Sequence, residues 1–247
     1  MLSGEFAELE RLSLLPDTHP RIKLLLELQK KYYNRLVNTM NNSPSQIRQD
    51  ALVLAVLDFK TGGYFVEFGA SNGVSNSNTW LLEKHYGWTG ILAEPARVHH
   101  PVLFANRQCY ISTDCVYTQT GSTVMFNQVH ASAELSTIDM YTDKDKHAHL
   151  RDAGDRYPVP TISLVDLLKK YNAPDTIDYM SIDTEGSEWD ILTNFDWSLY
   201  KIRIITCEHN HTEDRQKIYE FLSTKGYERV YAEFSDFDDW YILKDNK

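Results

Sequence analysis

The chain has 247 residues, of which 42% are hydrophobic and 24% are charged, as in an ordinary soluble globular protein. Its length suits one large α/β domain. Its 25 Lys and Arg against 35 Asp and Glu give a net charge of −10, which repels a phosphate backbone and argues against a nucleic-acid partner.

Residues 1–60 predict two helices. The first has one apolar face, because apolar side chains recur at steps of three and four: Leu25, Leu28, Tyr32 and Leu36. The second is expected to start at the capping-box signature Ser43-Pro44-Ser45-Gln46 and to run to about Phe59. We expect this helical extension to act as a lid, as a dimer interface in a homo-oligomer, or only in packing.

From residue 64, short apolar runs alternate with helical segments. Strands are expected at 64–68, 90–94, 108–112, 177–183, 201–208, 227–232 and 239–243, with an additional pair at 122–130 and its neighbour. Helices are expected at 77–86, 163–171, 187–194 and 212–225. The alternation predicts a mainly parallel sheet with helices on both faces, in one domain over residues 61–247. The polar, non-periodic stretch 137–160 is expected to be a functional or disordered loop.

Four of the predicted strands end in, or close to, a carboxylate: Glu67, Glu94, Asp183 and Glu208. In an open parallel sheet, ligands bind in the crevice at the carboxyl ends of the strands. Charged residues are costly inside a sheet, but at its rim they pair with ligand groups. These four acids are therefore expected to line one pocket.

The loop after the first predicted strand is Gly69-Ala70-Ser71-Asn72-Gly73, which lets the backbone pass close to a bound cofactor. It lacks the GxGxxG pattern that cradles a pyrophosphate, and this disfavours a nicotinamide dehydrogenase. An acid such as Glu94, near the end of the second strand, commonly holds ribose hydroxyls. The pattern favours a cofactor with ribose but no phosphate, such as S-adenosylmethionine. An NAD-linked oxidoreductase and a non-catalytic module that binds an adenosyl ligand are the alternatives.

Four stretches in this order carry a family resemblance: FVEFGASNGVSNSNTWLLEKHYGWTGILAEP (65–95), VPTISLVDLLKKY (159–171), IDYMSIDTEGSEWDILTNFDW (177–197) and IRIITCEHNHTEDRQKIYEFLSTKGYE (202–228). The chain resembles the FkbM-type S-adenosylmethionine-dependent methyltransferases, a branch of the Rossmann-like class. The resemblance implies a seven-stranded sheet whose last strand is antiparallel and pairs beside the sixth. It implies that VEFGASNG is the cofactor loop, Glu67 included, that Glu94 binds the ribose and that Asp183 lines the cofactor pocket. It also places Asp114 near the adenine amino group and implies O-methylation, often of sugars in glycans or secondary metabolites.

Methyl transfer to an alcohol requires collinear reactants and the removal of the hydroxyl proton, by a base or with the help of a metal. One hypothesis makes His209 or His211 the general base, oriented by a carboxylate. The acids that follow the fourth predicted strand, Asp183 and Glu185, face these histidines and are candidate catalytic residues with Glu208.

The other hypothesis makes Asp183, Glu208 and Asn210 oxygen ligands of Mg²⁺ or Mn²⁺. Side chains alternate along an extended segment, so 208 and 210 point to one side and 209 and 211 to the other. Only one of these pairs is therefore expected to face the pocket.

The compartment is predicted from the cysteines and the absence of sorting signals. Cys109, Cys115 and Cys207 show no CxxC spacing, which is typical of reduced thiols. The first fifteen residues do not resemble a signal peptide, and no apolar run approaches the about 18 residues of a membrane span. We expect a cytoplasmic protein.

Overall fold

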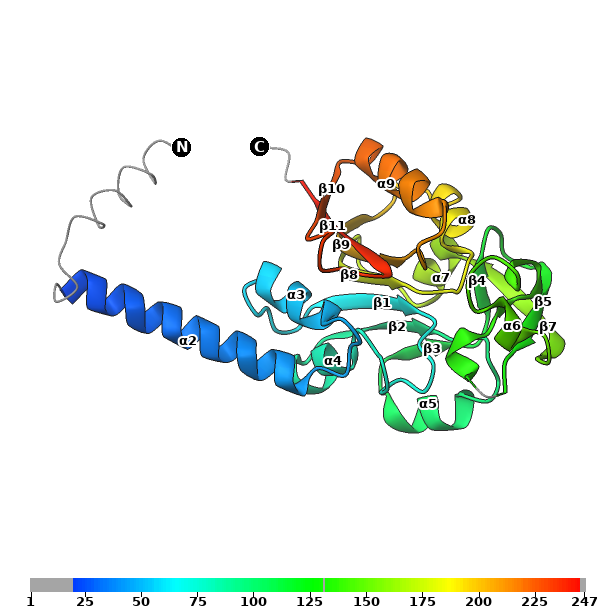
Figure 1. Cartoon of the computed structure of the whole chain (residues 1–247), viewed down its shortest axis with the longest axis horizontal. Helices are drawn as coiled ribbons and strands as arrows, with labels where there is room; N and C mark the ends of the chain where they lie inside the picture. The colour runs from blue at the N-terminus through cyan, green and yellow to red at the C-terminus, as the bar shows by residue number, and fades with distance from the viewer. Residues whose placement is uncertain (1–19, 131, 245–247) are drawn as a thin grey trace. The chain divides into compact units, whose positions relative to one another are not determined.

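A computed structural model describes residues 20–130 and 132–244, in two compact units, residues 1–43 and 44–247 (Figure 1). In the first unit, α2 (Pro20–Asn42) confirms the first predicted helix. Leu28 and Tyr32, on its predicted apolar face, are exposed. Residues 1–19 of the predicted extension and the side chain of Leu25 lie outside the described part of the chain.

The second unit begins with α3 (Gln49–Val56), which is shorter than predicted. The capping-box prediction was wrong, because Arg48 precedes the helix in a left-handed conformation (φ 68°) and Ser45 Oγ accepts its hydrogen bond from the amide of Gln49. The predicted end near Phe59 was also wrong, because Asp58 and Phe59 have positive φ, which ends a right-handed helix.

A seven-stranded sheet forms the centre of this unit, in the order β10-β11-β9-β8-β1-β2-β3. Its neighbours from β3 to β9 are parallel, while β11 is antiparallel to both β9 and β10, so the sheet is mixed in orientation. Each strand lies within two residues of its predicted position. The strands are β1 (Tyr64–Phe68), β2 (Thr89–Ala93), β3 (Tyr110–Ser112), β8 (Thr176–Ile182), β9 (Lys201–Glu208), β10 (Tyr227–Val230) and β11 (Asp238–Leu243).

One face of the sheet packs against three helices that the sequence predicts: α7 (Leu164–Lys170), α8 (Glu188–Thr193) and α9 (Asp214–Thr224). Val66 and Phe68 of β1 share a buried core with Leu167, Ile191 and Leu222 from these helices. Figure 1 shows the sheet and these helices as ribbons. The alternation of side chains along β1 turns Phe65 and Glu67 to the opposite face.

On that opposite face lie α4 (Trp80–Tyr86) and α5 (His100–Asn106). The guanidinium of Arg107, which follows α5, lies 5.5 Å from the centre of the Phe65 ring. Helix α5 was not predicted from the sequence. Only Leu103 in it is buried, so it has no apolar period that sequence reasoning could detect.

A second sheet has the order β4-β7-β5-β6. It contains β4 (Cys115–Tyr117), β5 (Thr123–Gln128), β6 (Thr137–Ile138) and β7 (Asp155–Ser163), with the short helices η1 (Ala133–Leu135), η2 (Asp139–Tyr141) and α6 (Ala148–Arg151). The expectation of a functional or disordered loop at 137–160 was therefore wrong as to structure, because strands and short helices form within this stretch. Two prolines and several polar side chains obscure β7 in the sequence, and the strand forms by pairing with β5 along that strand's whole length and with β4. No helix in the described residues is both long and apolar enough to cross a membrane.

Candidate functional site

A polar cavity of about 380 Å³ lies at the carboxyl ends of β1, β8 and β9. Strand-end acids line it together with amide, hydroxyl and cationic groups from other segments. The lining includes Gln46, Glu67, Gly69, Asn76, Asn78, Leu135, Lys146, His147, Leu150, Asp183, Glu185, Glu208 and Asn210.

A second, smaller cavity of about 40 Å³ adjoins it between the end of β2 and the second sheet. Glu94, Cys115, Val116 and Phe126 are among its lining residues. Five residues line both cavities, Phe68, Gly69, Ser71, Glu134 and Asp183, so the two spaces meet at the β1 loop and the end of β8.

At this meeting point, Gly69 lies so close to the backbone of Asp183 that no side chain fits. Its φ is 72°, and a Cβ atom built on it would lie 1.8 Å from the carbonyl oxygen of Asp183. Only glycine fits there, because the oxygen belongs to the backbone and cannot swing aside. Gly69 and Ala70 both donate their amides to the carbonyl of Ala93, at 3.0 and 3.3 Å, which ties the loop to β2.

The remaining loop residues, Asn72 and Gly73, shape and pack the loop. The side-chain oxygen of Asn72 accepts the amides of Val74 and Ser75, at 2.9 and 2.8 Å, and forms a turn. Gly73 packs beside Leu103 and the aliphatic part of Arg107. Ala70 and Ser71 line a cavity, whereas Asn72 and Gly73 do not.

Glu67 is the acid inside β1, and its carboxylate accepts hydrogen bonds from other residues of the chain. The side chain is buried and accepts the amide of Asn78 at 2.7 Å, and the hydroxyls of Ser77 and Thr79. Arg107 lies 3.7 Å away as a buried counter-ion. These donors lie at the start of α4, so Glu67 holds that helix against the sheet while it also borders the larger cavity.

Glu94, after β2, is also buried, and each of its oxygens accepts one amide. The amide of Ser71 donates to Oε2 and that of Ala96 to Oε1, both at 2.7 Å. Burial raises the pKa of Glu94 to about 7, although the two amides oppose the rise by favouring the charged form. The acid is thus fixed to the cofactor loop and faces the smaller cavity.

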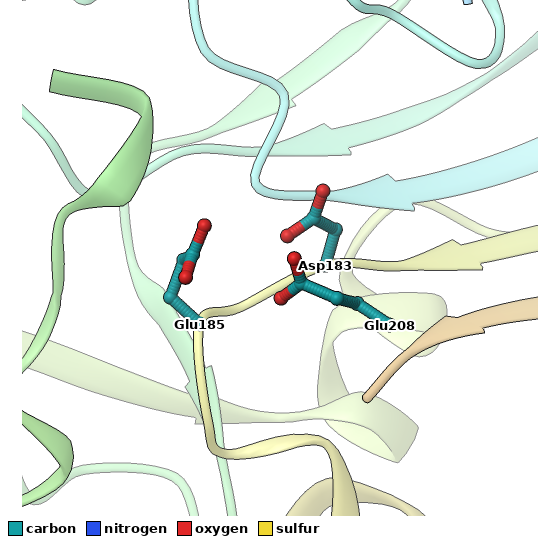
Figure 2. A group of neighbouring side chains, drawn as sticks. All are labelled: Asp183, Glu185 and Glu208. Atoms are coloured by element: carbon teal, nitrogen blue, oxygen red, sulfur yellow. The ribbon is translucent and has the colours of Figure 1, made fainter. Parts of the chain in front are cut away.

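Asp183, Glu185 and Glu208 form an acidic cluster at the ends of β8 and β9, and their carboxylates point toward a common space (Figure 2). One oxygen from each lies within 4.8 Å of the others. Burial raises the pKa of Asp183 to about 7, while a hydrogen bond with Glu208 opposes the rise. Burial and then the neighbouring carboxylates raise the pKa values of Glu185 and Glu208 well above the usual range. The cluster therefore carries an electrostatic cost that protons or a cation would relieve.

The two candidate histidines lie outside the larger cavity. The ring of His209 is buried against Asp239, with 3.7 Å between Nε2 and Oδ1, and its Nδ1 accepts the amide of His211. His211 is exposed, 3.4 Å from Asp236. Glu208 and Asn210 line the cavity, so one of the two predicted pairs does face it. The extended geometry behind that prediction ends at Glu208, however, because Asn210 and His211 have positive φ.

Asp114 also lies away from both cavities. Its carboxylate pairs with Lys170 at 2.9 Å and lies near the hydroxyl of Ser112. The next residue, Cys115, lines the smaller cavity instead.

Several lining residues were not singled out from the sequence. They come from the segment before α3, from the start of α4 and from the 134–150 segment, and include Gln46, Asn78, Leu135, Lys146 and Leu150. His147, which belongs to the polar stretch 137–160, also lies in the cavity wall, where burial lowers its pKa. The length of that polar stretch was the one signal that pointed to function.

An open sheet of this strand order, with a glycine turn after its first strand and cavities at the strand ends, defines an α/β protein of the Rossmann-like class. A family model described as the methyltransferase FkbM domain matches residues 67–241. The chain therefore belongs to the FkbM methyltransferase family, which confirms the resemblance seen in the sequence. The matched domain, residues 67–241, is thus of the methyltransferase type.

The solved structures that the chain matches are remote in sequence. Methyltransferase FkbM from Methylobacillus flagellatus KT is 13% identical with a TM-score of 0.46, and the match covers 74% of this chain but only 44% of that one. The O-methyltransferase from Bacillus cereus in complex with SAH is 14% identical with a TM-score of 0.40, over 94% of this chain and 93% of that one. A search of curated proteins gives no significant match.

Proposed function

We propose that this protein transfers the methyl group of S-adenosylmethionine to a hydroxyl of a sugar, a glycan or a related polyhydroxyl metabolite. The observation that carries the proposal is the junction of two unlike cavities at Gly69 and Asp183. One is small and partly apolar, and the other is larger and polar. A cofactor in the first would present its methyl group to an acceptor in the second.

The residues that line the smaller cavity suit the adenosyl part of the cofactor, although a space of about 40 Å³ must widen to admit it. Glu94 is placed to accept ribose hydroxyls, and Val116 and Phe126 offer apolar contacts for a base. Gly69 lets the cofactor cross the narrow junction toward the larger cavity. The earlier assignment of Asp114 to the adenine is not part of this proposal, because its carboxylate is paired with Lys170.

The larger cavity suits an acceptor rich in hydroxyls. Gln46, Asn76 and Asn78 contribute amide groups to its wall, and Lys146 adds a cationic one. Such groups both donate and accept hydrogen bonds, as a polyol requires. Gln46 precedes the domain predicted to start at residue 61, so the proposed enzyme uses residues from both predicted parts of the chain.

The acidic cluster is placed to assist removal of the hydroxyl proton. Its donor set is all oxygen, which fits Mg²⁺ or Mn²⁺. Asp183, Glu208 and Glu185 would hold the ion, with Asn210 beside them in the same cavity wall. A bound ion would lower the pKa of a coordinated hydroxyl.

The chain's own residues supply the remaining functions. Asp183 is the member of the acidic cluster that lines both cavities, so in this proposal its carboxylate lies next to cofactor and acceptor together. We favour a carboxylate of the cluster over His209 or His211 for handling the proton, because neither histidine lines the cavity. The free state of all three cysteines supports a cytoplasmic enzyme.

Calorimetric titration with S-adenosylhomocysteine, the demethylated product, tests the cofactor half of the proposal. We expect micromolar binding that Glu94→Ala abolishes and that Glu220→Ala, an exposed acid on α9, leaves unchanged. Saturation by NAD with no binding of S-adenosylhomocysteine would instead support an oxidoreductase.

The acceptor half requires turnover. Incubation with S-adenosylmethionine and a panel of sugars, followed by mass spectrometry, should detect a gain of one methyl group on oxygen. Cofactor binding without methylation of any hydroxyl compound, but with methylation of an amine or thiol panel, would contradict the assignment of the acceptor.

A further inference from the structure

Arg151, the last residue of α6, is fully buried, and all five of its N–H donors have acceptors. Nε donates to the carbonyl of Leu135 at 2.8 Å, and Nη1 donates to the carbonyl of Thr142 at 3.2 Å and to Asp145 Oδ1 at 2.9 Å. Nη2 donates to Asp145 Oδ2 at 3.0 Å and to Glu185 Oε2 at 2.6 Å. A buried guanidinium with this complete set of partners has a single orientation.

These contacts join two parts of the cavity wall. Leu135, Thr142 and Asp145 belong to the 134–150 segment, which contributes Leu135, Lys146 and other residues to the cavity. Glu185 belongs to the turn after β8 and is a member of the acidic cluster. Arg151 therefore makes a direct ion pair between the segment that encloses the acceptor cavity and the cluster.

The same contacts fix the orientation of the Glu185 carboxylate. Its Oε2 accepts from Arg151 and also from the side-chain amide of Asn210, at 3.2 Å. In the described part of the chain, no donor bonds to its Oε1. Glu185 itself has a φ of 58°, a conformation that a non-glycine residue keeps only when its surroundings hold it.

We propose that Arg151 is a positioning residue that holds Glu185 in the cluster so that one carboxylate oxygen stays available to a bound cation. The inference rests on the proposed function, because it assumes that the cluster takes a divalent ion. Arg151 touches neither cofactor nor acceptor in this role and acts only through Glu185.

The charge of Arg151 and its proposed role in orienting Glu185 predict opposite changes in cation affinity when Arg151 is replaced. A guanidinium this close to the cluster repels a cation, so its removal should tighten cation binding if charge alone matters. If Arg151 positions a ligand, its removal should weaken binding by about 10–100-fold, as for other partners that orient metal ligands. The sign of the change therefore separates the two roles.

The test is titration of the full chain with Mn²⁺ alone, for wild type, Arg151→Met and Arg151→Lys. Arg156→Met is the matched control, because Arg156 belongs to the same second sheet and pairs with Asp139 at 2.7 Å, away from the cluster. We expect about 10–100-fold weaker binding for Arg151→Met. We expect a smaller loss for Arg151→Lys and none for the control. Unchanged or tighter binding in a folded Arg151→Met variant would overturn the inference.

A double-mutant cycle keeps the test informative if Arg151→Met is too unstable to study. Glu185→Gln should weaken Mn²⁺ binding by itself, and Arg151→Lys should add nothing further in that background. Additive losses would show that Arg151 does not act through Glu185.

A parallel titration with S-adenosylhomocysteine separates failure of the Arg151 inference from failure of the proposed function. Wild-type protein that binds this ligand but no Mn²⁺ would overturn the inference and leave the cofactor assignment intact. Wild-type protein that binds neither would refute the proposed function as well.

Discussion

Replacing Gly69 by alanine should damage both the fold and the cofactor site. At φ 72°, an L-residue costs about 1–2 kcal/mol relative to glycine. The new Cβ would lie 1.8 Å from the carbonyl oxygen of Asp183, so β1 and β8 must also move apart at the junction of the two cavities. Overpacking of this kind adds about 1–3 kcal/mol. We expect a loss of roughly 3 kcal/mol in the free energy of unfolding.

Gly62→Ala is the matched control. Gly62 has a φ of 65° but nothing within 4 Å of the position of a Cβ atom, so it carries the backbone cost without the clash. Because about 1 kcal/mol shifts Tm by about 2–4 °C in a protein of this size, Gly69→Ala should melt roughly 6–12 °C lower than wild type and clearly below the control. It should also lose S-adenosylhomocysteine binding in calorimetry, which Gly62→Ala should keep. Equal melting temperatures and retained binding would refute the steric reasoning.

Four further predictions concern Glu94, Arg107 and Glu208. Because the pKa of Glu94 is about 7 and ribose hydroxyls donate to a carboxylate, S-adenosylhomocysteine should bind more tightly as pH rises from 6 to 8 in calorimetry, and Glu94→Gln should flatten this dependence. The raised pKa of Glu94 has the opposite effect on the stability of the ligand-free protein. The free energy of unfolding should fall as pH rises from about 4.5 through 7, because the unfolded chain ionises this carboxyl first. A pH series of melting curves should show a smaller fall in Glu94→Gln. Arg107→Met leaves the Glu83 carboxylate, which lies 2.7 Å from Arg107 Nε, without its counter-ion. The free energy of unfolding measured in urea should fall by about 3–5 kcal/mol. The double variant Arg107→Met/Glu83→Gln should recover part of this loss. Glu208→Gln should lower the methyl-transfer rate at least about 100-fold, while exposed His211→Ala keeps it, and a slow His211→Ala would revive the histidine hypothesis.

The central sheet could be predicted from the sequence because its strands are buried and apolar. Runs such as that of β8 are almost continuous in buried residues, and helices with a clear apolar stripe separate them. The second sheet could not be predicted in the same way. Strand β7 has exposed polar residues and two prolines, and its conformation comes from pairing with β5, which is distant in the sequence.

The positions of the site acids were also accessible from the sequence, because a parallel sheet brings its strand ends to one edge. Their partners were not. Nothing in the sequence around Arg151 indicates that this arginine is buried or that it reaches Glu185, 34 residues further along the chain. Contacts of this kind depend on how the 134–150 segment folds back, which local pattern does not determine.

The strand-end acids separate into two groups by what their oxygens already bind. Both oxygens of Glu67 are bonded to the start of α4, so this acid serves the fold first. Asp183 and Glu208 lie close to each other and to Glu185, and burial raises the pKa of both. Carboxylates crowded together in this way are costly, and they are retained where a ligand supplies a proton or a cation. By this physical criterion we propose that the reacting centre lies at Asp183 and Glu208, where the proposed cofactor loop meets the proposed acceptor cavity, with Glu67 as its structural support.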